Sequence, residues 1–247
     1  MQARCRFRLV GRTAIMSKVN ITKLNTPYVS VDGSYGGNQG WFKETDLKRK
    51  KTLEEYGCGL IGASDLISHI LGNNSFTREE YHKTILNFEK KYFHILPKLG
   101  ISGILIAWGL NLYFLLNRKK LREETGAKYR ARWFVRPSKM LDRIKEMLDN
   151  DLPIIFAIGP GFFRKNKVNL YHKEERDGKV IFKPVTKTKD HYVTITGVEE
   201  YPDNDKTMLQ ISSWGRKYYV NYSEYKNYVK KNDNYYFSNI LYIKKIS

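Results

Sequence analysis

Tyr56-Gly57-Cys58-Gly59-Leu60-Ile61 places a cysteine between two glycines, directly before an apolar run. The glycines permit a tight turn, and the run that follows predicts a helix that begins at the cysteine. The unpaired N–H groups and the dipole of a helix N-terminus stabilise a thiolate, which is the nucleophilic form of cysteine. Cys58 is therefore a candidate nucleophile. The alternative is a small buried cysteine that packs like an apolar residue.

The expected helix has one apolar face, because its apolar residues recur mostly at intervals of three and four. Asp65 and His69 fall on the other side, which we expect to be the wetter one. The apolar positions are Leu60, Ala63, Ile67, Ile70 and Leu71.

A second informative segment begins at His191. Residues 190–198 alternate between apolar and polar as a strand does, and a turn-rich break near Tyr201 and Pro202 separates them from a second strand over 208–214. A hairpin of these strands sets His191 opposite the Ser212 region. A hydroxyl there would hold the imidazole ring, which gives the base and the orienting group of a nucleophilic triad. The alternative is an ordinary histidine at the start of a strand.

Cys58, His191 and the run Ser212-Ser213-Trp214-Gly215, in that order, resemble the papain-like cysteine peptidases. The Gly-Cys-Gly string before a helix is most similar to the branch of the bacteriocin-processing peptidases. The resemblance implies that Ser212 orients His191, although the family has Asn there and the bacteriocin-processing relatives have Asp. It also implies that Trp214 shields this pair from water.

The same resemblance implies an oxyanion-hole glutamine upstream of the cysteine, and Gln39 is the candidate. The alternative is a glycine-rich turn with a solvated glutamine. The implied activity is a thiol-dependent hydrolase that cleaves peptide bonds. Two other functions stay open: a catalytically silent module that binds peptide or an anionic polymer, and an acyltransferase on the same site.

Helical patterns come first and strand patterns later, which predicts an α+β fold. The resemblance implies one papain-like domain over 31–247, with a helical lobe at about 31–150 and an antiparallel β lobe at about 151–247. We expect residues 1–30 to be a basic, flexible segment, with Met16 as an alternative start. The expected helices are 77–93, opened by a capping box, 138–149 and 223–230; the expected strands are 129–135, 152–159, 179–182, 191–198, 208–214, 217–220 and 235–244.

The most apolar stretch of the chain is Leu99 to Leu116, followed by Arg118-Lys119-Lys120. It is barely long enough to span a bilayer. Glycines, Ser102 and Asn111 interrupt it, and sequence typical of a folded domain lies on both sides. We therefore expect a buried loop and helix rather than a membrane span.

The chain of 247 residues has 44 Lys and Arg against 25 Asp and Glu, a formal charge of +19. A basic surface favours an anionic partner, although no specific nucleic-acid motif is present and a biased composition explains the charge equally well. Cys5 and Cys58 give the folded body no disulfide framework, and the N-terminus lacks the apolar region of a secretory signal, so we expect a cytoplasmic location. The five histidines and two cysteines match no metal motif and no phosphate loop is present, so we expect no metal and no cofactor.

Overall fold

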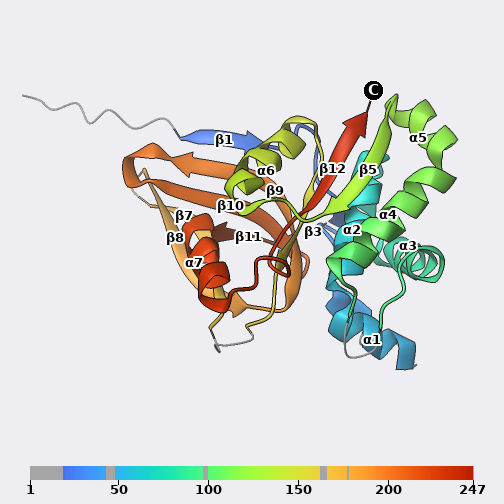
Figure 1. Cartoon of the computed structure of the whole chain (residues 1–247), viewed down its shortest axis with the longest axis horizontal. Helices are drawn as coiled ribbons and strands as arrows, with labels where there is room; N and C mark the ends of the chain where they lie inside the picture. The colour runs from blue at the N-terminus through green and yellow to red at the C-terminus, as the bar shows by residue number, and fades with distance from the viewer. Residues whose placement is uncertain (1–18, 43–47, 97–99, 162–165, 177, 247) are drawn as a thin grey trace, which may run out of the picture.

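The computed structural model describes residues 19–42, 48–96, 100–161, 166–176 and 178–246. The protein is a mixture of helix and sheet, as expected, and most helices gather at one end of the molecule while the main sheet forms the other (Figure 1). The helices are α1 (Lys48–Tyr56), α2 (Cys58–Ile70), α3 (Arg78–Lys91), α4 (Gly103–Leu116), α5 (Arg118–Thr125), α6 (Met140–Asp149) and α7 (Tyr222–Asn232). The basic segment 1–18, with Cys5 and Met16, lies outside the described residues.

In the described part of the chain, the main sheet has seven strands in the order β1-β9-β10-β11-β7-β8, with β6 also paired to β9. Its pairings are antiparallel, as expected for this half of the chain. The strands are β1 (Asn20–Lys23), β6 (Ile154–Ile158), β7 (Val168–Arg176), β8 (Lys179–Thr188), β9 (His191–Tyr201), β10 (Lys206–Ser213) and β11 (Arg216–Asn221). Two small sheets add β2 (Ser30–Val31), β3 (Ser34–Tyr35) and β4 (Ser75–Phe76), and β5 (Lys128–Trp133) with β12 (Leu241–Ile246).

The N-terminal boundary lies earlier than expected. Strand β1 pairs with β9, with Asn20 opposite Glu200, so the sheet already includes residues 20–23 and the boundary predicted at residue 31 is too late. The strand is short and mostly exposed. It joins the sheet through backbone hydrogen bonds, which leave no apolar pattern in the sequence.

Helix α2 is buried on nearly all sides, because it packs against α3 and α4 as well as against β6 and β9. Leu60, Ala63 and Ile67 are fully buried, as expected. Asp65 and His69 are buried too, with exposures of 1% and 4%, so their predicted position on the wetter side is wrong. Apolar periodicity identifies one packed face of a helix, and the second packed face of α2 is polar.

Helix α3 begins with the predicted capping box. The Thr77 hydroxyl accepts a hydrogen bond from the Glu80 N–H at 3.3 Å, and the Glu80 carboxylate accepts one from the Thr77 N–H at 2.8 Å. This reciprocal pair satisfies backbone donors that a helix start otherwise leaves unpaired.

Helix α4 forms within the apolar stretch, as expected, but only half of it is buried. Its inner face includes Ile106 and Leu110, which are fully buried. Its outer face leaves large apolar side chains exposed, so the prediction of a buried segment is wrong for that face. These side chains are Ile104, Leu105, Trp108, Leu112, Leu115 and Leu116. Over the described ranges, the structure contains no helix with the length and apolar character that crossing a membrane requires.

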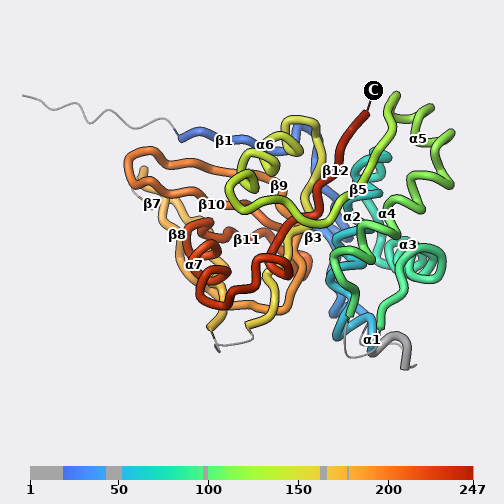
Figure 2. The backbone as a smooth tube through the Cα atoms, in the orientation of Figure 1, coloured from blue at the N-terminus to red at the C-terminus, as the bar shows by residue number. Residues whose placement is uncertain are grey.

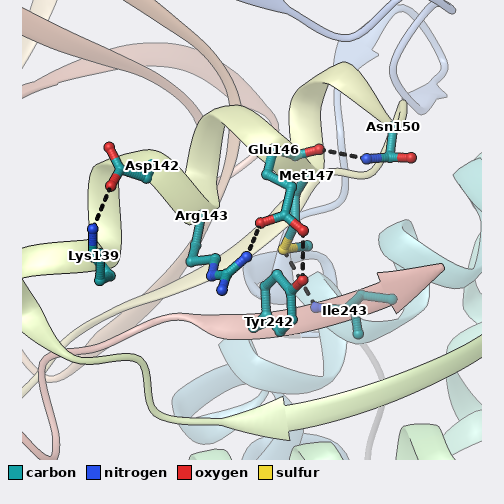
Figure 3. A network of polar contacts seen from close by, with 8 residues as sticks. All are labelled: Lys139, Asp142, Arg143, Glu146, Met147, Asn150, Tyr242 and Ile243. Carbon is teal, nitrogen blue, oxygen red and sulfur yellow. Dashed lines mark hydrogen bonds and ion pairs between the residues drawn. The ribbon is translucent and has the colours of Figure 1, made fainter.

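The closing strand β12 lies beside β5, between the helical end and the main sheet (Figure 2). It begins at Leu241 rather than at the predicted residue 235, because turns occupy most of residues 235–239. Helix α6 is held against it: the Tyr242 hydroxyl donates to Glu146 at 2.7 Å, and the Ile243 N–H donates to the Met147 sulfur at 3.3 Å (Figure 3). Arg143 pairs with the same Glu146 carboxylate.

Candidate active site

Cys58 is the first residue of α2, as predicted. The flanking glycines are needed for close packing rather than for a turn with positive φ. A Cβ on Gly57 would lie 2.2 Å from the carbonyl oxygen of Leu53 in α1, and a Cβ on Gly59 would lie 2.7 Å from the Ile101 side chain. The two glycines therefore let α1 and the segment before α4 approach the start of α2 on both sides of the cysteine.

Cys58 as a residue is half-buried, and backbone donors lie around its sulfur. The Tyr192 N–H points at its sulfur at 3.5 Å. Burial raises the pKa of the thiol, and the N–H groups of Tyr192, Gly59 and Cys58 itself lower it by a smaller amount. The net rise in pKa overturns the easier ionisation expected at a helix N-terminus, because burial outweighs the backbone donors. It favours a neutral thiol in the resting protein, with donors already in place for a developing negative charge.

His191 is the first residue of β9 and lies in the same cavity as Cys58. The Trp214 ring stacks on its imidazole, with ring centroids 4.6 Å apart and planes 15° apart, so Trp214 lies beside His191 as the resemblance implies. Burial lowers the pKa of His191 to about 4. The imidazole is therefore neutral near pH 7 and is able to accept a proton.

The side chain that holds His191 is Ser213, not the predicted Ser212. The Ser213 hydroxyl lies 2.9 Å from His191 Nε2, whereas the Ser212 hydroxyl donates to the backbone carbonyl of Tyr35 at 2.7 Å. The cause is a bulge. Gln210 pairs with Gly197 but Ile211 pairs with Ile195, so Thr196 in β9 has no opposing residue in the β9–β10 ladder.

This one-residue shift exchanges the faces of the two serines. In an unbroken ladder Ser212 would share a face with His191, since side chains alternate along a strand. After the bulge Ser212 pairs with Thr194, and Ser213 comes to the face of His191. The hairpin itself is confirmed, with the turn at Pro202–Asn204 where the sequence predicts it.

Gln39 lies on a 3-10 turn, Gln39–Phe42, and lines the same cavity as Cys58 and His191. Its amide nitrogen donates one hydrogen bond to the carbonyl of Glu54 at 2.8 Å. An amide nitrogen carries two hydrogens, so this bond fixes the side chain while a second donor remains on the same atom. All the predicted site residues line this one cavity: Gln39, Cys58, His191, Ser212 and Trp214.

The cavity they line has a volume of about 20 Å³, which is room for roughly one water molecule. A second cavity of about 640 Å³ also reaches Cys58 and His191. Its walls come from the end of α1, the segment before α4, the end of β6 and Phe237. The small cavity suits a single oxygen atom, and the larger one suits the chain of a substrate.

Asp65 is a site residue that the sequence analysis missed. Its carboxylate accepts hydrogen bonds from the hydroxyls of Tyr81 at 2.5 Å and Tyr28 at 3.0 Å, and from the Gly37 N–H at 3.0 Å. It therefore ties the loop that carries Gln39 to helix α2. Its position seven residues after Cys58, two helical turns along the same side, is the signal that could have placed it at the cavity.

The environment of Asp65 opposes its ionisation. Burial raises its pKa to about 6, even though its three hydrogen bonds favour the charged form. A Cβ on Gly37 would lie 1.9 Å from the Tyr81 hydroxyl, so only glycine lets the loop approach this network so closely.

Comparisons of the chain with protein-family models, with curated proteins and with solved structures find no match. In the described residues, no three His, Cys, Asp or Glu side chains gather in a way that could hold a metal ion. The side chains that line the site therefore define the chemistry open to it.

Proposed function

We propose that the protein is a thiol-dependent hydrolase that cleaves peptide bonds, with a site of the papain-like type. The observation that carries the proposal is the meeting of Cys58, at a helix N-terminus, and His191, at a strand start, in one cavity with backbone donors around the sulfur. The two residues are far apart in the chain, so their meeting depends on the whole fold.

In the proposed reaction the sulfur of Cys58 attacks the substrate carbonyl carbon while His191 accepts the thiol proton. The carbon–nitrogen bond then breaks, and His191 returns the proton to the leaving amine. Water attacks the resulting thioester with His191 as the base, which releases the acid and restores the thiol. Because burial favours neutral forms of both groups, the proton moves during the attack rather than before it.

The remaining residues have supporting roles. Ser213 holds the His191 ring and Trp214 covers it. The second amide hydrogen of Gln39 and the Cys58 N–H would donate to the oxyanion, and losing such a donor typically costs about a hundredfold or more in rate. The free thiol needs reducing conditions, so we place the activity in the cytoplasm.

A second function is favoured by one observation, the raised pKa of Cys58. A thiol that ionises reluctantly, beside a histidine held only by a hydroxyl, suits a catalytically silent module that binds peptide or an anionic polymer in the larger cavity. The two functions differ in whether His191 speeds reactions of the Cys58 sulfur.

The test is the rate of iodoacetamide alkylation against pH, read by peptide mass spectrometry, with Cys58 of the urea-unfolded protein as the reference. If His191 acts as a base, Cys58 of the folded protein reacts faster than this reference from about pH 5 upwards, because His191 is then neutral, and His191→Ala removes the advantage. A folded-state Cys58 that lags behind the unfolded reference at every pH, with no effect of His191→Ala, would refute the hydrolase and leave the binding module.

Turnover then separates the hydrolase from an acyltransferase. Peptide libraries are incubated with the wild type and with Cys58→Ala, with and without an added amine. Cleavage by water that is lost in Cys58→Ala supports the hydrolase. Products that form only with the amine support the acyltransferase.

A further inference from the structure

Helix α4 has a continuous apolar face that nothing in the described structure covers. The exposed residues Ile104, Leu105, Trp108, Leu112, Leu115 and Leu116 all fall within about one third of the helix circumference at 100° per residue. We call these six residues the α4 stripe. Trp108, at its centre, is 75% exposed. A patch of this kind on a folded protein marks an interaction surface.

A basic cavity adjoins the stripe at its C-terminal end. It has a volume of about 710 Å³ and lies between α4, α5 and β5, and Leu115 belongs both to its lining and to the stripe. Phe114, Leu121 and Tyr129 contribute apolar surface to it. Its charged lining residues are all cationic: Arg118, Lys119, Arg122 and Lys128.

The local charge around this cavity is strongly positive. Residues 118–128 hold five cations, the four of the cavity and Lys120, against Glu123 and Glu124. One of those carboxylates is already paired, because Glu124 lies 3.8 Å from Lys120. All five cations are exposed. An anionic group that reached the cavity would therefore meet net positive charge beside an apolar surface.

We infer that α4 docks on the surface of a membrane that contains anionic lipid. A helix lying in the plane of a bilayer presents apolar side chains and a tryptophan to the acyl boundary, with lysine and arginine beside them for the headgroups. The α4 stripe supplies the apolar side chains and the tryptophan, and the cations of α5 and β5 supply the charges for the headgroups. The charge complementarity between this cavity and an anionic headgroup favours lipid over a second protein surface, which would have to bring its own carboxylates.

Docking through α4 would also bring the larger cavity at Cys58 close to the membrane. Gly100, Ile101 and Ser102, directly before α4, line the larger cavity at Cys58. Helices α4 and α5 lie at the end of the molecule away from β7 and β8 (Figure 1). A docked protein would hold the larger cavity close to the lipid and the main sheet away from the lipid.

The test is flotation of the purified full-length protein with vesicles of phosphatidylcholine, with and without phosphatidylglycerol, at low and high salt. We expect binding that requires phosphatidylglycerol and weakens as salt rises, together with a blue shift of tryptophan fluorescence that Trp108→Phe abolishes. Replacing Lys119 with Glu should lower the partition coefficient by about fivefold or more, since each cation near an anionic surface contributes about that factor. Leu115→Ser should lower it as well.

Matched controls lie at the opposite end of the molecule. Ile181→Ser changes an exposed aliphatic residue of β8, and Lys183→Glu changes a lysine of the same strand. Both should bind vesicles as the wild type does. Equal loss in the control and the α4 variants, or binding to neutral and anionic vesicles alike, contradicts the inference. So does a dimer in solution that Leu115→Ser dissociates, because a second copy would then be what covers the stripe.

Discussion

Replacing Asp65 with Asn should change how the stability of the fold depends on pH. Burial raises the pKa of this carboxyl from 3.8 to about 6 in the folded protein. Between these values the folded protein holds a proton that the unfolded chain has lost, so the free energy of unfolding falls as pH rises. The shift is about two pKa units, at about 1.36 kcal/mol each. The free energy of unfolding should therefore fall by about 3 kcal/mol as pH rises from below 4 to above 6.

His191 acts in the opposite direction over nearly the same range. Its pKa falls from 6.5 to about 4 on folding, so the unfolded chain holds the extra proton and the free energy of unfolding rises with pH. The two contributions largely cancel in the wild type. Asp65→Asn removes the contribution of Asp65 and leaves that of His191. The free energy of unfolding of the variant should therefore rise by about 3 kcal/mol relative to that of the wild type as pH rises from 4 to 7.

The assay is urea denaturation of both proteins at several pH values, with the difference in the free energy of unfolding plotted against pH. Lost hydrogen bonds to Tyr28 and Tyr81 add an offset that does not vary with pH, so the slope alone carries the test. Asp203→Asn, at an exposed carboxylate in the β9–β10 turn, is the matched control. A flat difference for Asp65→Asn would mean that burial does not govern this carboxyl.

Four substitutions test the site and its packing. Ser213→Ala should slow alkylation of Cys58 at pH 6 by about two- to twelvefold, since a hydrogen bond of about 0.5–1.5 kcal/mol is lost, while Ser212→Ala leaves that rate unchanged; equal effects would contradict the observed register. Gly62→Ala should stabilise the fold by up to about 1 kcal/mol in urea denaturation, because alanine favours helix and its Cβ would meet no atom closer than 3.4 Å. Gly59→Ala should destabilise it by about 1–3 kcal/mol through overpacking, because two side-chain atoms lie within 2.8 Å of its Cβ; a stable variant would show that these side chains move aside.

Local signals in the sequence predicted local structure well. The capping box at Thr77 and Glu80 was confirmed, because both partners lie within four residues of each other. The helix start at Cys58 and the strand start at His191 were also confirmed, since each is marked by a change of apolar period at one point of the chain.

Features that depend on distant contacts were not predictable in the same way. The choice of Ser213 over Ser212 follows from the bulge at Thr196, and nothing near the serines marks it. The burial of Asp65 follows from Tyr28 and Tyr81, which approach it from other elements. Apolar periodicity shows which residues of a helix share a face, but it does not show how many other elements pack against that helix. The same limit explains why the exposed face of α4 was not predicted.

The side chains along strand β8 oppose self-association at an open edge of the main sheet. It is the last strand of the main sheet and runs for 10 residues, almost all exposed. Such an open edge is a template on which another chain could add a strand and start aggregation. Lys179, Lys183 and Lys187 place a charge at every fourth position, and Pro184 removes a backbone donor. Among the described residues no further strand pairs with this edge, and it resists addition through the residues it carries.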